Sequence, residues 1–342
     1  MPVSAYETLS NGICPWLQAP LQRFEAARRG GRLGHGWLMA GPQGLGKINL
    51  ALVAARRLLE STDGPVPALE AREAATAMRE RHEPSDHHPD LHWLFPEPKR
   101  RTLTVDQIRE ATRVLSLTSL TGQAKVLVLE PADAMTTAAA NALLKTLEEP
   151  SADTYLLLVS HQPGKLPATI RSRCQSLPIS RPPVAETVAW LKGAGKAQQG
   201  VDWLALLDTA KGLPFRVIGL QGSSFFKNYK ELDNKLYAIS TNRLDPQMVA
   251  DEWLASDIEA SLSWLSARLQ AIIRARLASD GASGEDSSAS ELTEAWKQLK
   301  TRFLFEQLQK VELLLGQLGG GINVELAVRA LLLGFQPEGA RR

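Results

Sequence analysis

One run of eight residues constrains this chain more than any other stretch: Gly41-Pro42-Gln43-Gly44-Leu45-Gly46-Lys47-Ile48. It follows the Walker A phosphate-loop pattern at every fixed position except the last. An apolar run over 37–40 precedes it and predicts a strand, and apolar residues at helical spacing over 50–60 predict a helix. Strand, glycine-rich turn and helix is the context in which backbone N–H groups and a lysine bind phosphate. We therefore predict a phosphate-loop fold.

The last position of this run lacks a metal ligand. A Ser or Thr there would coordinate the Mg²⁺ that bridges the β- and γ-phosphates. Ile48 has no oxygen to offer, and Mg²⁺ demands oxygen ligands. Gly41, Gly44, Gly46 and Lys47 are thus predicted to form a degenerate nucleotide site. Weak binding of ATP or ADP stays open, whereas efficient hydrolysis of Mg-ATP is not expected.

The acidic residues that should follow the buried strand predicted at 126–129 are also altered. In phosphate-loop ATPases that strand ends in two acids, one holding Mg²⁺ and one positioning the attacking water. Here the run 126–129 leads into Glu130-Pro131-Ala132-Asp133. Glu130 still provides a carboxylate, but Pro131 stands where the catalytic acid is needed. Asp133, two residues farther on, is interpreted as a loop residue.

The remaining pattern alternates strand and helix up to about residue 180 and is helical afterwards. Uninterrupted apolar runs at 125–129 and 155–159 are typical of strands buried on both faces of a parallel sheet. Thr104 and Gln107 form a predicted capping box at the start of a helix. The expected helices span residues 15–30, 105–117, 136–149, 186–191, 203–209, 214–220, 258–277, 291–318 and 324–333. Among the large aromatic residues after 250, core positions are expected for Trp253, Trp264, Trp296 and Phe303.

A polar stretch with several prolines, residues 61–101, separates the first helix after the loop from the capping box. Its histidines suggest a zinc site: His82, His87, His88 and His92. No cysteine accompanies them, and their spacing matches no structural zinc site. We expect a surface loop here and no metal.

Composition narrows the class of protein. A chain of 342 residues with 44% hydrophobic residues is long enough for two or three domains and excludes wholesale disorder. A net charge of +2 gives no argument for nucleic acid, and the basic run at 99–101 is short. Two cysteines fit a reduced, cytoplasmic setting. We find neither an apolar run of membrane-spanning length nor an export signal in residues 1–12.

Three further motifs resemble those of bacterial clamp-loader subunits, which belong to the AAA+ class. They are the run from Asn141 to Pro150, the tripeptide Lys165-Leu166-Pro167, and Ile170-Arg171-Ser172-Arg173-Cys174. The resemblance extends over nearly all of the chain, and the degenerate nucleotide motifs resemble the delta-prime branch of DNA polymerase III more than the tau/gamma motor. It implies an α/β AAA+ module over 1–180, a small helical lid over 181–222, and an all-α collar that forms oligomers over 223–342.

The resemblance also assigns roles to single residues. Arg173 lies where the family carries an arginine finger, which would reach the ATP site of a neighbouring tau/gamma subunit. Ser160 holds the sensor-1 position, and Phe215 holds the sensor-2 slot usually given to arginine, with Arg216 beside it. The implied partners are tau/gamma and delta subunits and, through the assembled complex, the sliding clamp and primed DNA. The nucleotidyltransferase activity of DNA polymerase would reside in other subunits.

Two alternatives to a noncatalytic subunit remain at this stage. An active AAA+ ATPase would bind and hydrolyse ATP with Lys47 and Glu130 through unusual metal ligation. A stand-alone DNA-binding protein would contact backbone phosphates, with a steep dependence on salt.

Overall fold

The computed structural model describes residues 13–59, 89–97, 100, 102–121, 123–194, 201–221, 223–278, 292, 295–296, 299–318 and 322–336. Contacts divide the chain into two compact units. The sheet unit contains the described residues up to 194 together with 213–215, and the helical unit contains 201–212 and the described residues from 216 onward. The expected division into three domains with boundaries near 180 and 222 stays a prediction.

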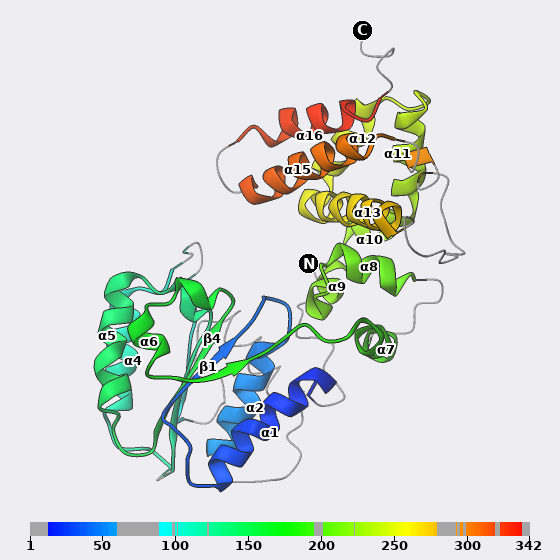
Figure 1. Ribbon diagram of the computed structural model, residues 1–342. Coiled ribbons are helices and arrows are strands. Elements are labelled where there is room, and N and C mark those ends of the chain that lie inside the picture. Colours follow the sequence, from blue (N-terminus) through cyan, green and yellow to red (C-terminus); the bar gives the residue numbers. More distant parts are fainter. Residues whose placement is uncertain are drawn as a thin grey trace. The chain divides into compact units, whose positions relative to one another are not determined.

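The sheet unit is built on five parallel strands in the order β2-β3-β4-β1-β5. The strands are β1 (Gly36–Ala40), β2 (Leu91–Leu94), β3 (Lys125–Leu129), β4 (Thr154–Ser160) and β5 (Gln175–Pro178). Helices α1 (Pro15–Arg29) and α2 (Lys47–Leu59) lie on one side of the sheet in Figure 1, and α4 (Val105–Leu115), α5 (Thr137–Glu148) and α6 (Ala168–Arg171) lie on the other. Helix α7 (Val184–Ala194) follows β5.

Alternation along the central strands divides the apolar residues between the two faces. Trp37 and Met39 of β1 belong to the core cluster under α1 and α2, whereas Leu38 between them belongs to the cluster under α4 and α5. The same alternation separates Val126 and Val128 from Leu127 and Leu129 in β3. Both faces need apolar cover, so these strands read as unbroken hydrophobic runs in the sequence.

Two strands were not anticipated from the sequence. The polar stretch 61–101, expected to be a surface loop, contains β2, which pairs with β3 from Leu91 to Leu94. This strand has only four residues between proline-containing segments, and it pairs on one side only, as edge strands do. At the opposite edge, β5 ends at Pro178, a residue tolerated where one side of the strand is unpaired.

The capping box is confirmed at the start of α4. Thr104 Oγ1 accepts a hydrogen bond from Gln107 N, and Gln107 Oε1 accepts one from Thr104 N at 3.0 Å. Two backbone N–H groups that the helix cannot pair are thereby satisfied.

The helical unit confirms the helices expected at 203–209, 258–277 and 324–333 and the part of the helix expected at 214–220 that lies in it. It comprises α8 (Trp203–Thr209), α9 (Pro214–Leu220) from Arg216 onward, α10 (Ser224–Asn228), α11 (Leu232–Ser240), α12 (Pro246–Ala255), α13 (Ile258–Ala278), α15 (Thr301–Gln317) and α16 (Val324–Leu333). Trp253, Trp264 and Trp296 are buried as expected, and Trp296 stacks on Phe335 with ring centroids 4.7 Å apart. Phe303 is only partly buried.

The expectation of one long helix over 291–318 is wrong. Lys300 has extended backbone angles and precedes α15 as its N-cap residue. The carbonyl of Leu299, which would accept a hydrogen bond within a continuous helix, accepts one from the Arg276 guanidinium instead. Residues 279–290 lie outside the described residues, as do His82, His87 and His88.

Asp90 organises the turn between α4 and β3. Its side chain, only 3% exposed, accepts hydrogen bonds from the backbone N–H groups of Leu120 and Thr121 and from the hydroxyls of Ser119 and Thr121. Burial alone would raise the pKa of Asp90, but these hydrogen bonds outweigh it and lower the pKa to about 2.

We predict that Asp90→Asn destabilises the protein by about 2 kcal/mol at neutral pH, because an amide cannot replace four accepted hydrogen bonds. The folded pKa lies below the unfolded value of about 3.9, so the stabilisation is complete above that pH and is lost as pH falls toward 2. Urea unfolding at pH 7, 5 and 3 measures this difference between the two proteins. Asp106→Asn, whose side chain is 87% exposed, is the control. A difference that stays constant over this pH range would contradict the prediction.

Candidate functional site

The residues singled out as a nucleotide site lie at the carboxyl ends of adjacent parallel strands. β1 leads into the phosphate loop at Gly41, β3 leads into Glu130, and β4 ends at Ser160, which lies opposite Ala40 in the pairing of β1 with β4. Ligands of open α/β sheets bind at this edge. The parallel sheet therefore brings together the phosphate loop, Glu130 and Ser160, which are far apart in the sequence.

The phosphate loop keeps the backbone geometry that its glycines allow. Gly46 has a φ of +79°, a conformation that residues with a side chain rarely adopt. At Gly41 a Cβ atom would lie 2.2 Å from the carbonyl oxygen of Ile179, so only glycine fits there. Lys47 then begins α2, as the motif requires.

Aromatic side chains of the same unit cover this loop. The backbone N–H of Phe215 donates to the carbonyl of Gly44 at 3.1 Å, and a Cβ at Gly46 would lie 2.6 Å from Phe215 Cε2. Trp16 Nε1 donates to the carbonyl of Leu45 at 2.9 Å. Trp190 of α7 packs edge-on against Trp16 with ring centroids 5.0 Å apart. The sensor-2 slot, predicted to hold Phe215, is thus packed directly on the phosphate loop.

Lys47 and Ile48 are both buried. The Lys47 ammonium donates to the carbonyl of Pro42 within the loop at 2.6 Å, and its side chain is 3% exposed. Burial lowers the pKa of Lys47 to about 8, although the carboxylates of Glu130 and Asp133 act in the opposite direction. Ile48 belongs to the hydrophobic cluster beneath the loop. The position of the missing magnesium ligand has become part of the core.

Asp133 is more than the loop residue expected from the sequence. It lies in a short 3-10 turn, Ala132–Ala134, and its Oδ1 accepts hydrogen bonds from Ser160 Oγ at 2.7 Å and from His161 N at 2.6 Å. Burial opposes ionisation, but these hydrogen bonds outweigh it and hold the pKa of Asp133 below its usual range. The carbonyl of Ser160 in turn accepts the N–H of Gly41. Asp133 therefore connects the end of β3 to Ser160, the predicted sensor-1 residue, and through it to the phosphate loop, a role that the two-residue offset concealed.

Arg173 lies apart from this buried group, just after α6. Its Nη2 lies 2.5 Å from Oε1 of Glu148, and its Nη1 donates to the carbonyl of Thr169 at 3.1 Å. The side chains of Arg173 and Glu148 are 36% and 48% exposed, so the pair faces water. Sequence reasoning identified Arg173 but gave Glu148 no role, although both lie in the motifs that carried the resemblance.

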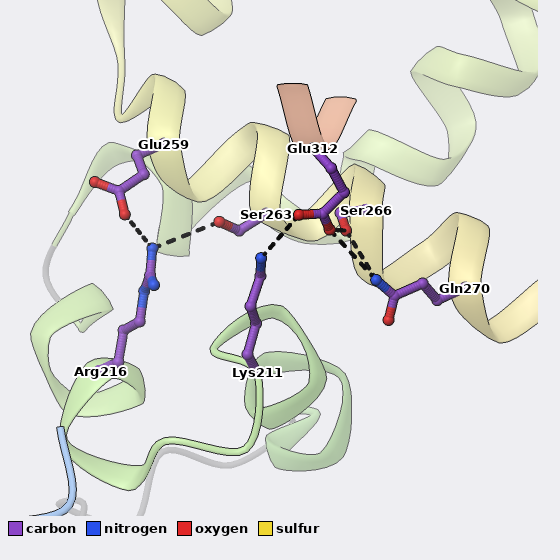
Figure 2. A network of polar contacts seen from close by, with 7 residues as sticks. All are labelled: Lys211, Arg216, Glu259, Ser263, Ser266, Gln270 and Glu312. Atoms are coloured by element: carbon purple, nitrogen blue, oxygen red, sulfur yellow. Dashed lines mark hydrogen bonds and ion pairs between the residues drawn. The ribbon is translucent and has the colours of Figure 1, made fainter. Parts of the chain in front are cut away.

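Arg216 is held within the helical unit. Its guanidinium pairs with Glu259 and contacts Ser263, both on α13 (Figure 2). Lys211, after α8, reaches Glu312 of α15 at 3.4 Å, and Glu312 also accepts from Ser266 and Gln270 of α13 (Figure 2). Arg216 thus joins α9 to α13, and Glu312 joins α15 to α13 and to Lys211.

Metal ligands do not gather in the part of the chain that the structure describes. No group of three or more His, Cys, Asp or Glu side chains there could hold a metal ion. Of the four histidines considered for zinc, only His92 is described, and it lies in β2. Both cysteines, Cys14 and Cys174, are free thiols. None of the described helices is long and apolar enough to cross a membrane.

Two family models match the chain. One, described as DNA polymerase III, delta subunit, matches residues 16–183, and the other, DNA polymerase III, delta subunit, C terminal, matches residues 223–336. The subunit delta' of DNA polymerase III from Pseudomonas aeruginosa is 32% identical over 270 residues, which are 78% of this chain and 79% of the relative. Its counterpart from Escherichia coli is 34% identical over 62% of each chain. That from Bacillus subtilis is 37% identical over 43% of each chain.

Solved structures resemble the chain more distantly. A DNA polymerase III gamma subunit-related protein from Thermotoga maritima has a TM-score of 0.44 and 16% identity, covering 91% of this chain and 98% of its own. The RuvB Holliday junction branch migration motor of the same organism has a TM-score of 0.39 and 16% identity, covering 86% and 87%.

We predict that Gly46→Ala destabilises the protein by about 1–3 kcal/mol, because the new methyl group meets the Phe215 ring and the backbone conformation is strained for alanine. Urea unfolding of this variant, of Phe215→Ala and of the double variant measures the coupling between the two positions. The double variant should lose less stability than the sum of the single changes. Gly164→Ala, where no atom lies within 4 Å of the new Cβ, is the control and should be nearly neutral. Strict additivity would contradict direct packing of Phe215 on the loop.

Proposed function

The chain belongs to the family of DNA polymerase III delta-prime subunits, and we propose that it is a noncatalytic subunit of the clamp loader. In this role it helps load the sliding clamp onto primed DNA during replication, and it donates Arg173 to the ATP site of a neighbouring tau/gamma subunit. The observation that carries the noncatalytic assignment is the burial of Ile48 in the core at the position of the magnesium ligand.

Several features of the phosphate loop support the loss of hydrolysis. Lys47, whose charge would bind β- and γ-phosphates, donates to Pro42 and lies in the field of Glu130 and Asp133. Phe215, predicted to hold the slot usually given to the sensor-2 arginine, packs against Gly46. Pro131 replaces the acid that would position water. Together these features disfavour hydrolysis of ATP at this loop.

The exposure of Arg173 supports its role in trans. A guanidinium that acts on a neighbour must lie at the surface, and the Arg173 side chain is 36% exposed on the side of the sheet covered by α5 and α6. Guanidinium groups stabilise the charge that develops on a transferring phosphoryl group. An ion pair that merely stabilises the fold is the alternative role for Arg173, and Glu148 is its partner in that case.

The proposed partners follow from the family. Tau/gamma and delta subunits would complete the ring, which contacts the clamp and primed DNA as an assembly in the cytoplasm. Helix α16 offers a surface for assembly, since Leu326 and Leu333 on it are 65% and 39% exposed. Exposed apolar residues that line one side of a helix are typical of protein interfaces.

The competing function is an ATPase that works alone. It rests on Lys47 and Glu130, which are retained and lie close enough for their charges to interact. Turnover by the purified chain that disappears in Lys47→Ala would favour this function over the noncatalytic one.

We predict that Arg173→Ala slows ATP turnover by the assembled loader at least several-fold. Arginine fingers are worth roughly 10³ to 10⁵ in rate in other systems, and only the site that borders this chain loses its finger. Steady-state phosphate release with clamp and primed DNA measures the effect. The variant should unfold at the same temperature as the wild type and elute with tau/gamma and delta in size-exclusion chromatography. Unchanged turnover in an intact complex would contradict the finger role.

We predict that Ile48→Thr leaves the isolated chain without ATPase activity. The new hydroxyl restores one magnesium ligand, but Pro131 still provides no acid to position water, and Phe215 still covers the loop. Phosphate release by the isolated variant, compared with Ile48→Thr/Lys47→Ala, measures any turnover that depends on the loop. Hydrolysis in the single variant that is absent from the double variant would show that Ile48 alone blocks catalysis.

A further inference from the structure

Glu148 is the only described residue whose side chain forms an ion pair with Arg173. It is the last residue of α5, so its carboxylate lies at the helix C-terminus, where unpaired carbonyl groups and the helix dipole also favour a cation. Its neighbour Glu149 is exposed as well but forms no ion pair among the described residues. Two adjacent acids of the same motif therefore differ in whether they contact the arginine.

The guanidinium is held from two sides. Nη2 lies 2.5 Å from Glu148 Oε1, and Nη1 donates to the Thr169 carbonyl in the four-residue helix α6 at 3.1 Å. One anchor is charged and comes from the end of α5, whereas the other is a backbone group of α6. The two contacts fix both the direction and the plane of the guanidinium.

These anchors leave part of the guanidinium available. A guanidinium carries five N–H groups, and the contacts to Glu148, to the Thr169 carbonyl and to Ser172 Oγ, which lies 3.5 Å from Nη1, use at most three of them. The Arg173 side chain stays 36% exposed with both contacts formed. A phosphate group of another protein can therefore bind the exposed N–H groups without displacing Glu148.

We propose that Glu148 is a positioning residue that orients Arg173 for the ATP site of the neighbouring subunit. This role rests on the proposed function of Arg173 as a finger in trans. Glu148 contacts neither the nucleotide nor the attacking water in this role and acts only through the arginine. By holding the long side chain in one conformation, it reduces the rotamer freedom that Arg173 would otherwise lose on reaching the phosphate.

The expected size of the effect follows from the exposure of the pair. Exposed ion pairs contribute up to about 1 kcal/mol of interaction free energy. If all of it lowers the activation free energy, it corresponds to a factor of about five in rate. Removal of Glu148 should thus slow the loader by about two- to fivefold, less than removal of Arg173 itself. Because Glu148 affects the transition state and not the binding of ATP, kcat should fall while KM for ATP changes little.

The experiment compares loaders assembled with Glu148→Ala, Glu148→Gln, Glu149→Ala, Arg173→Ala and Glu148→Ala/Arg173→Ala, with kcat and KM measured at two salt concentrations. We expect Glu148→Ala to lower kcat, Glu148→Gln to lie between it and the wild type, and Glu149→Ala to have no effect. The double variant should be no slower than Arg173→Ala. The difference between wild type and Glu148→Ala should shrink at high salt, since exposed charges are screened. Melting temperatures control for folding.

Other results would overturn the proposal. If the loader with Glu148→Ala had the same kcat as the wild type, the ion pair would have no role in turnover. If its kcat were higher, Glu148 would restrain the finger. Slowing by Glu149→Ala, or additional slowing in the Arg173→Ala background, would indicate an effect that does not pass through Arg173. If Arg173→Ala itself leaves turnover unchanged, the finger role fails. If it slows turnover while Glu148→Ala does not, only the positioning role fails.

Discussion

A phosphate loop gathers backbone N–H groups and one lysine around a small space, and this positive charge needs a partner whether or not phosphate is bound. In this chain the partners come from the protein. Lys47 donates to Pro42 in its own loop, and the carboxylates of Glu130 and Asp133 balance its charge. The burial that lowers the pKa of Lys47 is the same burial that brings Phe215 and Ile48 against the loop. The loop is thus part of the core.

This packing connects the carboxyl ends of three adjacent parallel strands. Asp133 joins the end of β3 to Ser160 at the end of β4, and Ser160 joins Gly41 at the end of β1. These hydrogen bonds are formed by groups that are themselves buried or held by the backbone, so they do not require a ligand to persist. These contacts therefore join the carboxyl ends of three strands through the protein's own groups.

The sequence predicted those features whose cause is local. The capping box of Thr104 and Gln107 depends on four consecutive residues, and the buried strands β3 and β4 are long enough to show their apolar character. Strand β2 was not predicted, because four residues are too few to show the alternation of apolar and polar residues that identifies a strand. Its pairing with β3 is set by tertiary structure. The interruption of the expected helix before α15 was not predicted for a similar reason. The Leu299 carbonyl accepts a hydrogen bond from Arg276, which is distant in the sequence. The partners of Asp133 and Arg173 likewise depend on which loops the parallel sheet brings together.

Lys47 and Arg173 carry the same charge but differ in what surrounds them. Lys47 is 3% exposed, and a charge in such surroundings interacts strongly with its partners because little water screens it. Releasing it to an external phosphate would leave the buried carboxylate of Glu130 without its cation, which is costly. Arg173 pairs with Glu148 in water, where both groups can gain or lose a partner at small cost. Burial therefore distinguishes Lys47, whose charge is held by groups of the fold, from Arg173, whose charge stays at the surface.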